Sequence, residues 1–206
     1  TVTDASGTPV TVTDNAFTMP AKAVTASATF KEGTYTVTFN AGEGEGTMES
    51  QSIGSSTAVA LSANTFSRTN YDFAGWKDEN GNAYTDGQEI TLAEDIVLTA
   101  QWTPKEYTVT NTATNATFES SVDKVTYGTA AVWTVSANDG YTVDESYITV
   151  TIGGSAYTDF TVAENATNTT MLDITIPGDA LTGNVVITVT AKLPPADVTV
   201  ETAING

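Results

Sequence analysis

Apolar and polar residues alternate along much of the chain in short runs. The clearest runs of period two are Tyr35–Phe39, Ile96–Trp102, Val132–Ala137, Tyr147–Ile152 and Val185–Thr190. Strict alternation is typical of a β-strand that buries one face and exposes the other. The residues predicted to face a core are Val132, Ile148, Val150, Ile187 and Val189, while Thr and Ser face water.

Turn-forming sequences separate these runs. They are NAGEGEG at 40–46, ENGN at 79–82, NDG at 138–140, IGGS at 152–155 and PGD at 177–179. Gly, Asn, Asp and Pro favour tight reversals between strands. Helical periodicity is nearly absent, and Ser56–Asn64 is the best candidate, with room for one or two turns. The pattern therefore predicts an all-β fold made of small modules.

The chain also repeats itself. Tyr-Thr-Val-Thr occurs at Tyr35 and again 72 positions later at Tyr107, and residues 17–30, 90–102 and 174–192 share an apolar-Thr-apolar start, a turn and an alternating strand. Such self-similarity indicates tandem modules. We predict four parts: the C-terminal part of a divergent module at 1–31, whole modules at 34–103 and 106–193, and a linker or the start of a next module at 194–206.

Composition narrows the role. The chain has 7 basic and 25 acidic residues, a net charge of −18, and neither His nor Cys. Nucleic-acid and anionic-lipid binding depend on clustered Lys and Arg, so neither partner is expected. No stretch approaches the roughly 18 apolar residues of a spanning helix, so membrane insertion is not expected either. Disulfides, Cys/His zinc sites and Ser-His or Cys-His nucleophile pairs are excluded. We expect no catalysis.

Aromatic residues concentrate in unit 34–103 and have two interpretations. They provide a platform for stacking sugar rings, or they fill the core of a module too small to have another. We favour the core. The predicted structural core residues are Tyr35, Val37, Phe39, Tyr71, Phe73, Trp76 and Trp102, with Trp133 in the following unit.

Unit 34–103 resembles the Listeria–Bacteroides repeat, also called the internalin-type B repeat. That family has a Y-x-V-x-F strand, a Gly-rich hairpin, a G-Y-x-F-x-G-W segment and a closing A-x-W. The matching residues are Tyr35, Val37, Phe39, Tyr71, Phe73, Gly75, Trp76, Ala100 and Trp102. Asn70 departs from the family, which usually carries Gly there; Asn also tolerates a positive φ, so the turn is expected to survive.

The resemblance implies a small β-grasp-like fold, found in tandem on secreted and surface-anchored bacterial proteins. Unit 106–193 is similar to bacterial Ig-like repeats, which implies a β-sandwich, and residues 17–30 are similar to the last hairpin of a divergent B repeat. Together these resemblances imply an elongated arrangement of modules, located outside the cell or attached to its surface or wall.

The segment 78–89 offers a candidate metal site. Its oxygen donors follow the spacing of an EF-hand loop: Asp78, Asn80, Asn82, Asp86 and Glu89. Ala83 stands where that loop needs Gly, and no helices flank it. The other interpretation, which we favour, is a hairpin, as in the family named above. No cofactor is expected, with calcium as the one candidate ion.

We therefore interpret the chain as a non-catalytic stalk or spacer of a secreted or surface bacterial protein. Its expected partners are the neighbouring modules of the same chain. The alternative is an adhesin or carbohydrate-binding module that contacts a host surface protein or a glycan, and an exposed aromatic patch would favour it.

Overall fold

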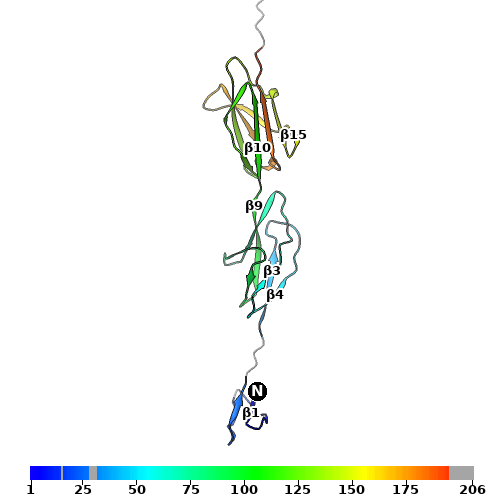
Figure 1. The fold of residues 1–206 in the computed structure, drawn as a ribbon, viewed down its shortest axis with the longest axis vertical. Coiled ribbons are helices and arrows are strands. Elements are labelled where there is room, and N and C mark those ends of the chain that lie inside the picture. Colours follow the sequence, from blue (N-terminus) through cyan, green and yellow to red (C-terminus); the bar gives the residue numbers. More distant parts are fainter. Residues whose placement is uncertain (15, 28–31, 195–206) are drawn as a thin grey trace, which may run out of the picture.

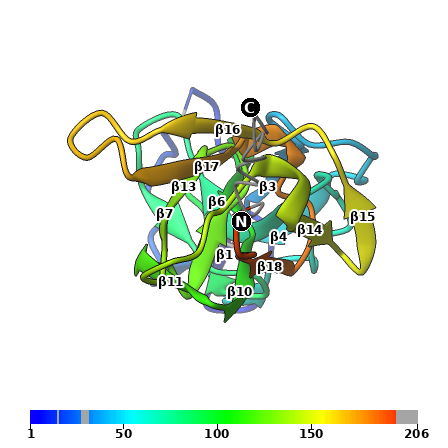
Figure 2. The same ribbon diagram turned by 90° about the horizontal axis from the view of Figure 1, so that it is seen from above.

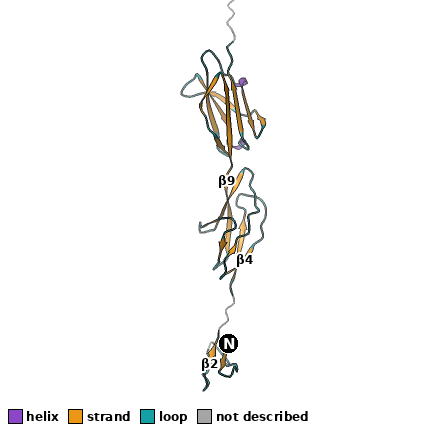
Figure 3. Ribbon diagram, viewed as in Figure 1, coloured by secondary structure: helices purple, strands orange, loops and turns teal. Residues whose placement is uncertain are grey.

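The computed structural model describes residues 1–14, 16–27 and 32–194. Strands make up almost all of the regular structure, and the two helices within these residues are single 3₁₀ turns, η1 (Glu145–Tyr147) and η2 (Gly178–Ala180) (Figure 3). The all-β fold class predicted from the alternating pattern is thereby confirmed. The described residues fall into an N-terminal hairpin, a first module (residues 32–104) and a second module (residues 105–194).

Residues 1–27 contain one pair of strands. β1 (Val2–Asp4) pairs antiparallel with β2 (Val24–Ala26). None of the described residues in this part is buried, and Met19 is 64% exposed. A two-stranded sheet without a core is marginal in water. Phe30, which the sequence also marks as apolar here, lies outside the described residues.

The first module is built on one mixed five-stranded sheet with the order β4-β3-β9-β6-β7. The first and last long strands, β3 and β9, are parallel, and the other neighbours are antiparallel. A two-stranded sheet, β5-β8, lies beside it. The bounds are β3 (Thr34–Asn40), β4 (Gln51–Gly54), β5 (Val59–Ala60), β6 (Tyr71–Lys77), β7 (Ala83–Tyr84), β8 (Glu89–Ile90) and β9 (Ile96–Pro104).

Alternation along these strands creates the core of the first module. On β3, Val37 and Phe39 are buried between exposed Thr residues, and Trp76 on β6 is 1% exposed. The ring of Trp76 lies 5.0 Å from Phe39 and 4.9 Å from Phe73, between ring centroids. Aromatic rings therefore cluster around Trp76 within a core that also contains aliphatic side chains.

The helical turns that the sequence allowed at Ser56–Asn64 are not formed. This segment instead contains β5, whose Val59 pairs with Ile90 of β8. Leu61 follows and is buried in the core. The segment thus lies over the sheet as extended chain, because its apolar residues at 59 and 61 alternate with period two.

The second module is a sandwich of two sheets. One has the order β12-β10-β18-β14-β15 and the other β11-β13-β17-β16. Viewed along the long axis, β13, β16 and β17 lie on one side and β14, β15 and β18 on the other (Figure 2). The bounds are β10 (Glu106–Thr114), β11 (Ala116–Ser120), β12 (Lys124–Thr126), β13 (Ala131–Ala137), β14 (Ile148–Ile152), β15 (Ser155–Tyr157), β16 (Thr161–Glu164), β17 (Met171–Ile176) and β18 (Val185–Thr190).

The sandwich core is mainly aliphatic. Ile148 and Val150 on β14 and Ile187 and Val189 on β18 are buried, as the alternation predicts. Val132 is the exception and the prediction for it was wrong: it is 45% exposed. Trp133 and Val135 occupy the inward positions of β13, so the strand register turns Val132 toward solvent.

The two modules follow each other along the long axis of the molecule (Figure 1). β9 ends at Pro104 and β10 begins at Glu106, so one residue separates the last strand of one module from the first strand of the next. The predicted linker or next module is described only as far as Pro194; residues 195–206 lie outside the described residues.

Candidate functional site

Asp78, the first candidate calcium ligand, is engaged in a hairpin. Residues 78–82 join β6 to β7, with Trp76 opposite Tyr84 and Lys77 opposite Ala83. The Asp78 carboxylate accepts hydrogen bonds from the backbone N–H groups of Asn80 and Asn82, from Asn82 Nδ2 at 2.8 Å and from the Tyr84 hydroxyl at 3.1 Å. The Asp78 carboxylate thus closes the hairpin through both of its oxygens.

The protonation equilibria follow from this network. Hydrogen bonds, first that from the Asn82 side chain, hold the pKa of Asp78 below its ordinary value. Partial burial, and then the hydrogen bond to Asp78, raise the pKa of Tyr84. The hydrogen bond between Tyr84 and ionised Asp78 contributes to both shifts and is a structural contact within the hairpin.

The remaining candidate ligands lie on other elements. Asp86 Oδ1 accepts a hydrogen bond from the backbone N–H of Asn64 at 2.9 Å, and Glu89 belongs to β8, opposite Ala60. Within the described part of the chain no three acidic residues are grouped so as to hold a metal ion. The structure thus does not bring the five residues of the candidate loop together.

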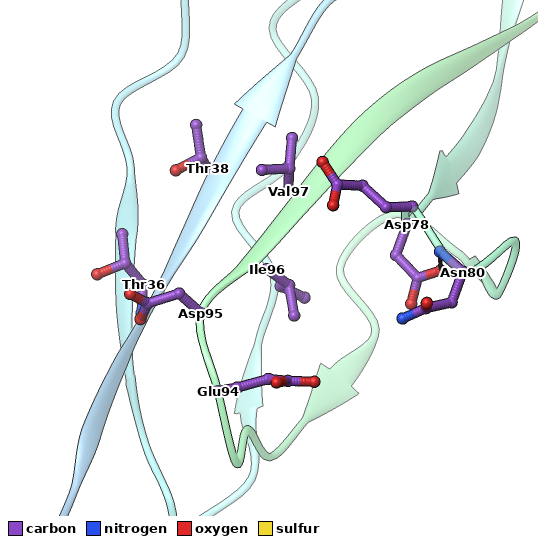
Figure 4. Close-up of a pocket in the computed structure, with 9 residues that line it drawn as sticks. Thr36, Thr38, Asp78, Asn80, Glu94, Asp95, Ile96 and Val97 are labelled. Carbon is purple, nitrogen blue, oxygen red and sulfur yellow. Dashed lines mark hydrogen bonds between the residues drawn. The ribbon is translucent and has the colours of Figure 1, made fainter.

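A shallow acidic depression lies beside β9 (Figure 4). Glu94 and Asp95 come from the loop before β9, and Asp78 and Glu79 from the hairpin on its other side. Asp95 Oδ1 already accepts a hydrogen bond from Thr36 N at 2.7 Å. No basic residue lines the depression. Four carboxylates thus face the depression without a basic partner among its lining residues, so its charge repels anions.

The predicted core residues divide into two groups by burial. Val37, Phe39, Trp76 and Trp133 are buried. The other four are half-buried at the margins of the core: Tyr35, Tyr71, Phe73 and Trp102. Trp102 is held by a hydrogen bond from its Nε1 to the carbonyl of Ala41 at 3.0 Å.

No aromatic side chain among residues 1–14, 16–27 and 32–194 is fully exposed. The exposed large apolar residues there are instead Val12, Met19, Val122, Val132, Val186 and Leu193. Each aromatic ring in the described ranges is thus at least partly covered by its neighbours.

The junction between the two modules is held by hydrogen bonds from both sides. The backbone N–H of Lys105 donates to the carbonyl of Asn70 at 2.9 Å, and the carbonyl of Lys105 accepts from Tyr127 N at 3.0 Å. The single connecting residue is thus hydrogen-bonded to both modules. Since both of its polar backbone groups are paired, its dihedral angles are constrained from either side.

Side chains add to this junction. The Tyr107 hydroxyl donates to Asn70 Oδ1 at 3.2 Å, and the rings of Tyr71 and Tyr127 meet edge to face at 5.6 Å. The Arg68 guanidinium lies 3.6 Å above the Tyr71 ring and forms an ion pair with Glu43 at 2.6 Å. The contacts link the start of β6, the start of β10 and the loop after β12.

Asn70 contributes both its backbone and its side chain to the junction. Its φ is +62°, so it takes the left-handed conformation expected at this position. Where the family usually carries Gly, the Asn side chain reaches the next module. Sequence reasoning noted the departure but not its use, because the partner Tyr107 lies 37 positions away and depends on how the modules dock.

No helix in the described part of the chain is long and apolar enough to cross a membrane.

Comparison with known proteins identifies the family of the first module. None of the curated proteins matches the chain, and none of the solved structures does. Residues 35–101, however, match the family model described as Listeria-Bacteroides repeat domain. The first module is therefore a Listeria–Bacteroides repeat, which indicates a repeat segment of a bacterial surface protein.

Proposed function

We propose that the chain is a non-catalytic spacer that holds other parts of a bacterial surface protein at a distance from the cell. Its working partners are the neighbouring modules of the same chain, and its place is outside the cell, secreted or attached to the wall. The function is geometric: the modules keep a fixed relative direction and add length.

The observation that carries the proposal is the junction at Lys105. A flexible linker would leave its backbone groups to water and would avoid contacts across the gap. Here the backbone of Lys105 is hydrogen-bonded to Asn70 on one side and to Tyr127 on the other. The rings of Tyr71 and Tyr127 also pack against each other across the junction. Bending would break these contacts together, so the two modules are expected to move as one body.

The surface supports the same role. The net charge is −18, and the aromatic rings are turned partly or wholly inward within the described residues. A strongly acidic exterior keeps a protein soluble and suppresses non-specific association. Such a surface suits a part that is meant to separate other domains without adhering to them.

Small-angle X-ray scattering of the full chain tests the spacer function. The native chain is compared with a variant that has two Gly-Ser pairs inserted between Lys105 and Glu106. We expect a scattering profile of two modules in line, and a smaller and broader distribution of pair distances for the variant. Identical profiles for both proteins would overturn the proposal.

The competing adhesin function is addressed by a glycan array and by titration with calcium. A spacer gives no binding above background on the array and an unchanged scattering profile with calcium. Saturable binding of one glycan class, lost when a surface residue is substituted, would instead assign the chain to carbohydrate recognition.

A further inference from the structure

Both modules connect their ends by the same device. In the first module the first strand β3 runs parallel to the last strand β9, with Val37–Asn40 against Ile96–Thr99. In the second module β10 runs parallel to β18, with Val109–Thr114 against Val185–Thr190. We call each of these pairs a terminal-strand clamp. Each clamp pairs the strand by which the chain enters a module with the strand by which it leaves.

An Asx side chain closes each clamp at its entry. Asp95, immediately before β9, accepts a hydrogen bond from Thr36 N at 2.7 Å. Asn184, immediately before β18, accepts one from Thr108 N at 3.1 Å. Thr36 and Thr108 occupy the same place in the two Tyr-Thr-Val-Thr sequences. The repeated sequence therefore marks the clamp strand in two modules whose remaining folds differ.

The direction of the strands decides how a clamp responds to tension. When the two ends of a module are pulled apart, parallel terminal strands slide along each other, and all hydrogen bonds between them are loaded at once. When two strands are peeled from one end, the bonds break one after another. The first geometry resists a much larger force.

We infer that the terminal-strand clamps are force-resisting elements and that the second module withstands more tension than the first. This inference rests on the proposed spacer function and adds that the spacer works under load. The clamp of the second module is longer by two residue pairs and is extended at its exit by Ala191 N, which donates to Thr114 O at 2.9 Å.

Burial strengthens the second clamp further. Val185, Ile187 and Val189 of β18 are all 0% exposed, so sliding of β18 also withdraws three side chains from the core. In the clamp region of β9, Leu98 is buried, while Ile96 and Val97 are half-buried. Core disruption and hydrogen-bond rupture therefore coincide more fully in the second module.

Single-molecule force spectroscopy on the full chain tests the inference. The chain has no Cys, so handles attach only at introduced positions. With Thr34→Cys and Leu193→Cys, we expect two ruptures: first a weaker one that releases about 240 Å of chain, then a stronger one that releases about 300 Å, at 3.3–3.6 Å per extended residue. The reverse order would overturn the ranking of the modules.

A change of pulling direction isolates the clamp from general stability. With Glu106→Cys and Leu193→Cys the second clamp is sheared, and with Glu106→Cys and Thr182→Cys the same strands are peeled. We expect the high-force rupture to disappear in the second arrangement, with an unfolding step of about 260 Å. Equal rupture forces in both directions would overturn the clamp, even if scattering confirmed an extended spacer.

The Asx residue is tested by Asn184→Ala, with Asn184→Asp as the matched control that retains a side-chain acceptor. We expect a lower rupture force for Asn184→Ala in the shear arrangement and a force near the native one for Asn184→Asp. An Asn184→Ala rupture force equal to the native one in shear would exclude Asn184 from the clamp.

Discussion

The two modules build their hydrophobic cores from different sheet arrangements and different side chains. The first covers its five-stranded sheet with loops and the short β5-β8 pair, and its core combines aliphatic residues with the rings of Phe39, Phe66 and Trp76. The second places two sheets face to face and fills the space with Val, Ile and Leu around a single Trp133. A large rigid ring substitutes for a missing second layer, because each aromatic side chain buries about 150–250 Å². Where a second sheet exists, β-branched residues suffice.

The largest expected effect comes from removing the central Trp of either module. Trp76→Ala and Trp133→Ala should each destabilise by about 3–5 kcal/mol, through lost burial and the cavity left behind. Hydrogen exchange read by mass spectrometry reports each module separately. We expect Trp76→Ala to lose protection in residues 32–104 and Trp133→Ala in 105–194. Equal loss in both modules from one substitution would show that they fold as a single unit.

A smaller effect is expected where glycine permits close packing. A Cβ at Gly44 would lie 2.5 Å from Cζ2 of Trp102, which its own hydrogen bond holds in place, whereas a Cβ at Gly178 would overlap the backbone at Gly128. Gly44→Ala and Gly178→Ala should each cost about 1–3 kcal/mol. In calorimetry Gly44→Ala lowers the transition of the first module and Gly178→Ala that of the second.

The matched control for Gly44→Ala is Gly33→Ala in the same module. An added Cβ there meets only the end of the Tyr35 side chain, at 3.3 Å. The Tyr35 hydroxyl has room to shift, so the control should leave the transition of the first module near its native temperature. If Gly44→Ala were as mild as the control, Trp102 would not be rigidly packed.

The next effect concerns acid, which should change the stability of the two modules differently in the Asp173→Asn variant. Hydrogen bonds from the Asn165 side chain, and then from Thr134, lower the pKa of Asp173. A lowered pKa stabilises the fold above the ordinary carboxyl pKa, and this stabilisation is lost as the pH falls through the folded value. Asp173→Asn should therefore weaken the second module at neutral pH and make its stability less steep between pH 5 and 2.

The first module is the internal control for that titration. Asp78, whose pKa is also lowered, remains intact, so the first transition of Asp173→Asn should keep its native dependence on pH. The measurement is thermal unfolding by calorimetry at a series of pH values. A second transition as steep in acid as the native one would contradict the role assigned to Asp173.

The smallest effect on stability concerns the junction. Asn70→Gly keeps the left-handed backbone and removes only the side-chain contact to Tyr107, which is worth at most about 1 kcal/mol. Tyr107→Phe removes the same hydrogen bond from the other side and is the matched control. Both transitions should stay near native, while residual dipolar couplings reveal greater motion between the modules. Unchanged couplings in both variants would show that the backbone bonds of Lys105 suffice.

Much of the fold is predictable from the sequence because strand alternation is a local property. The runs at Tyr35–Phe39 and Val185–Thr190 lie within β3 and β18. Val132 shows the limit: in the run from Val132 to Ala137, Val132 and Trp133 are both apolar neighbours, and only pairing with β17 decides which one faces inward. The sequence pattern alone does not distinguish the two registers.

The junction was beyond such local reasoning. Its hydrogen bonds join residues that are far apart in the chain, as Asn70 and Tyr107 are, and they exist only after both modules have folded. The spacing of Asp78 to Glu89 left a calcium loop and a hairpin open as alternatives for a related reason. Oxygen donors at suitable intervals bind a cation only when the backbone curls around it, and here β6 and β7 pair as a hairpin instead.

The fixed direction between the modules is tested most directly by double electron–electron resonance between spin labels at Thr38→Cys and Thr149→Cys, one on an exposed strand position of each module. The absence of native Cys makes this labelling unambiguous. We predict a single narrow distance distribution that broadens when Gly-Ser pairs are inserted between Lys105 and Glu106. A native distribution as broad as that of the insertion variant would contradict the account.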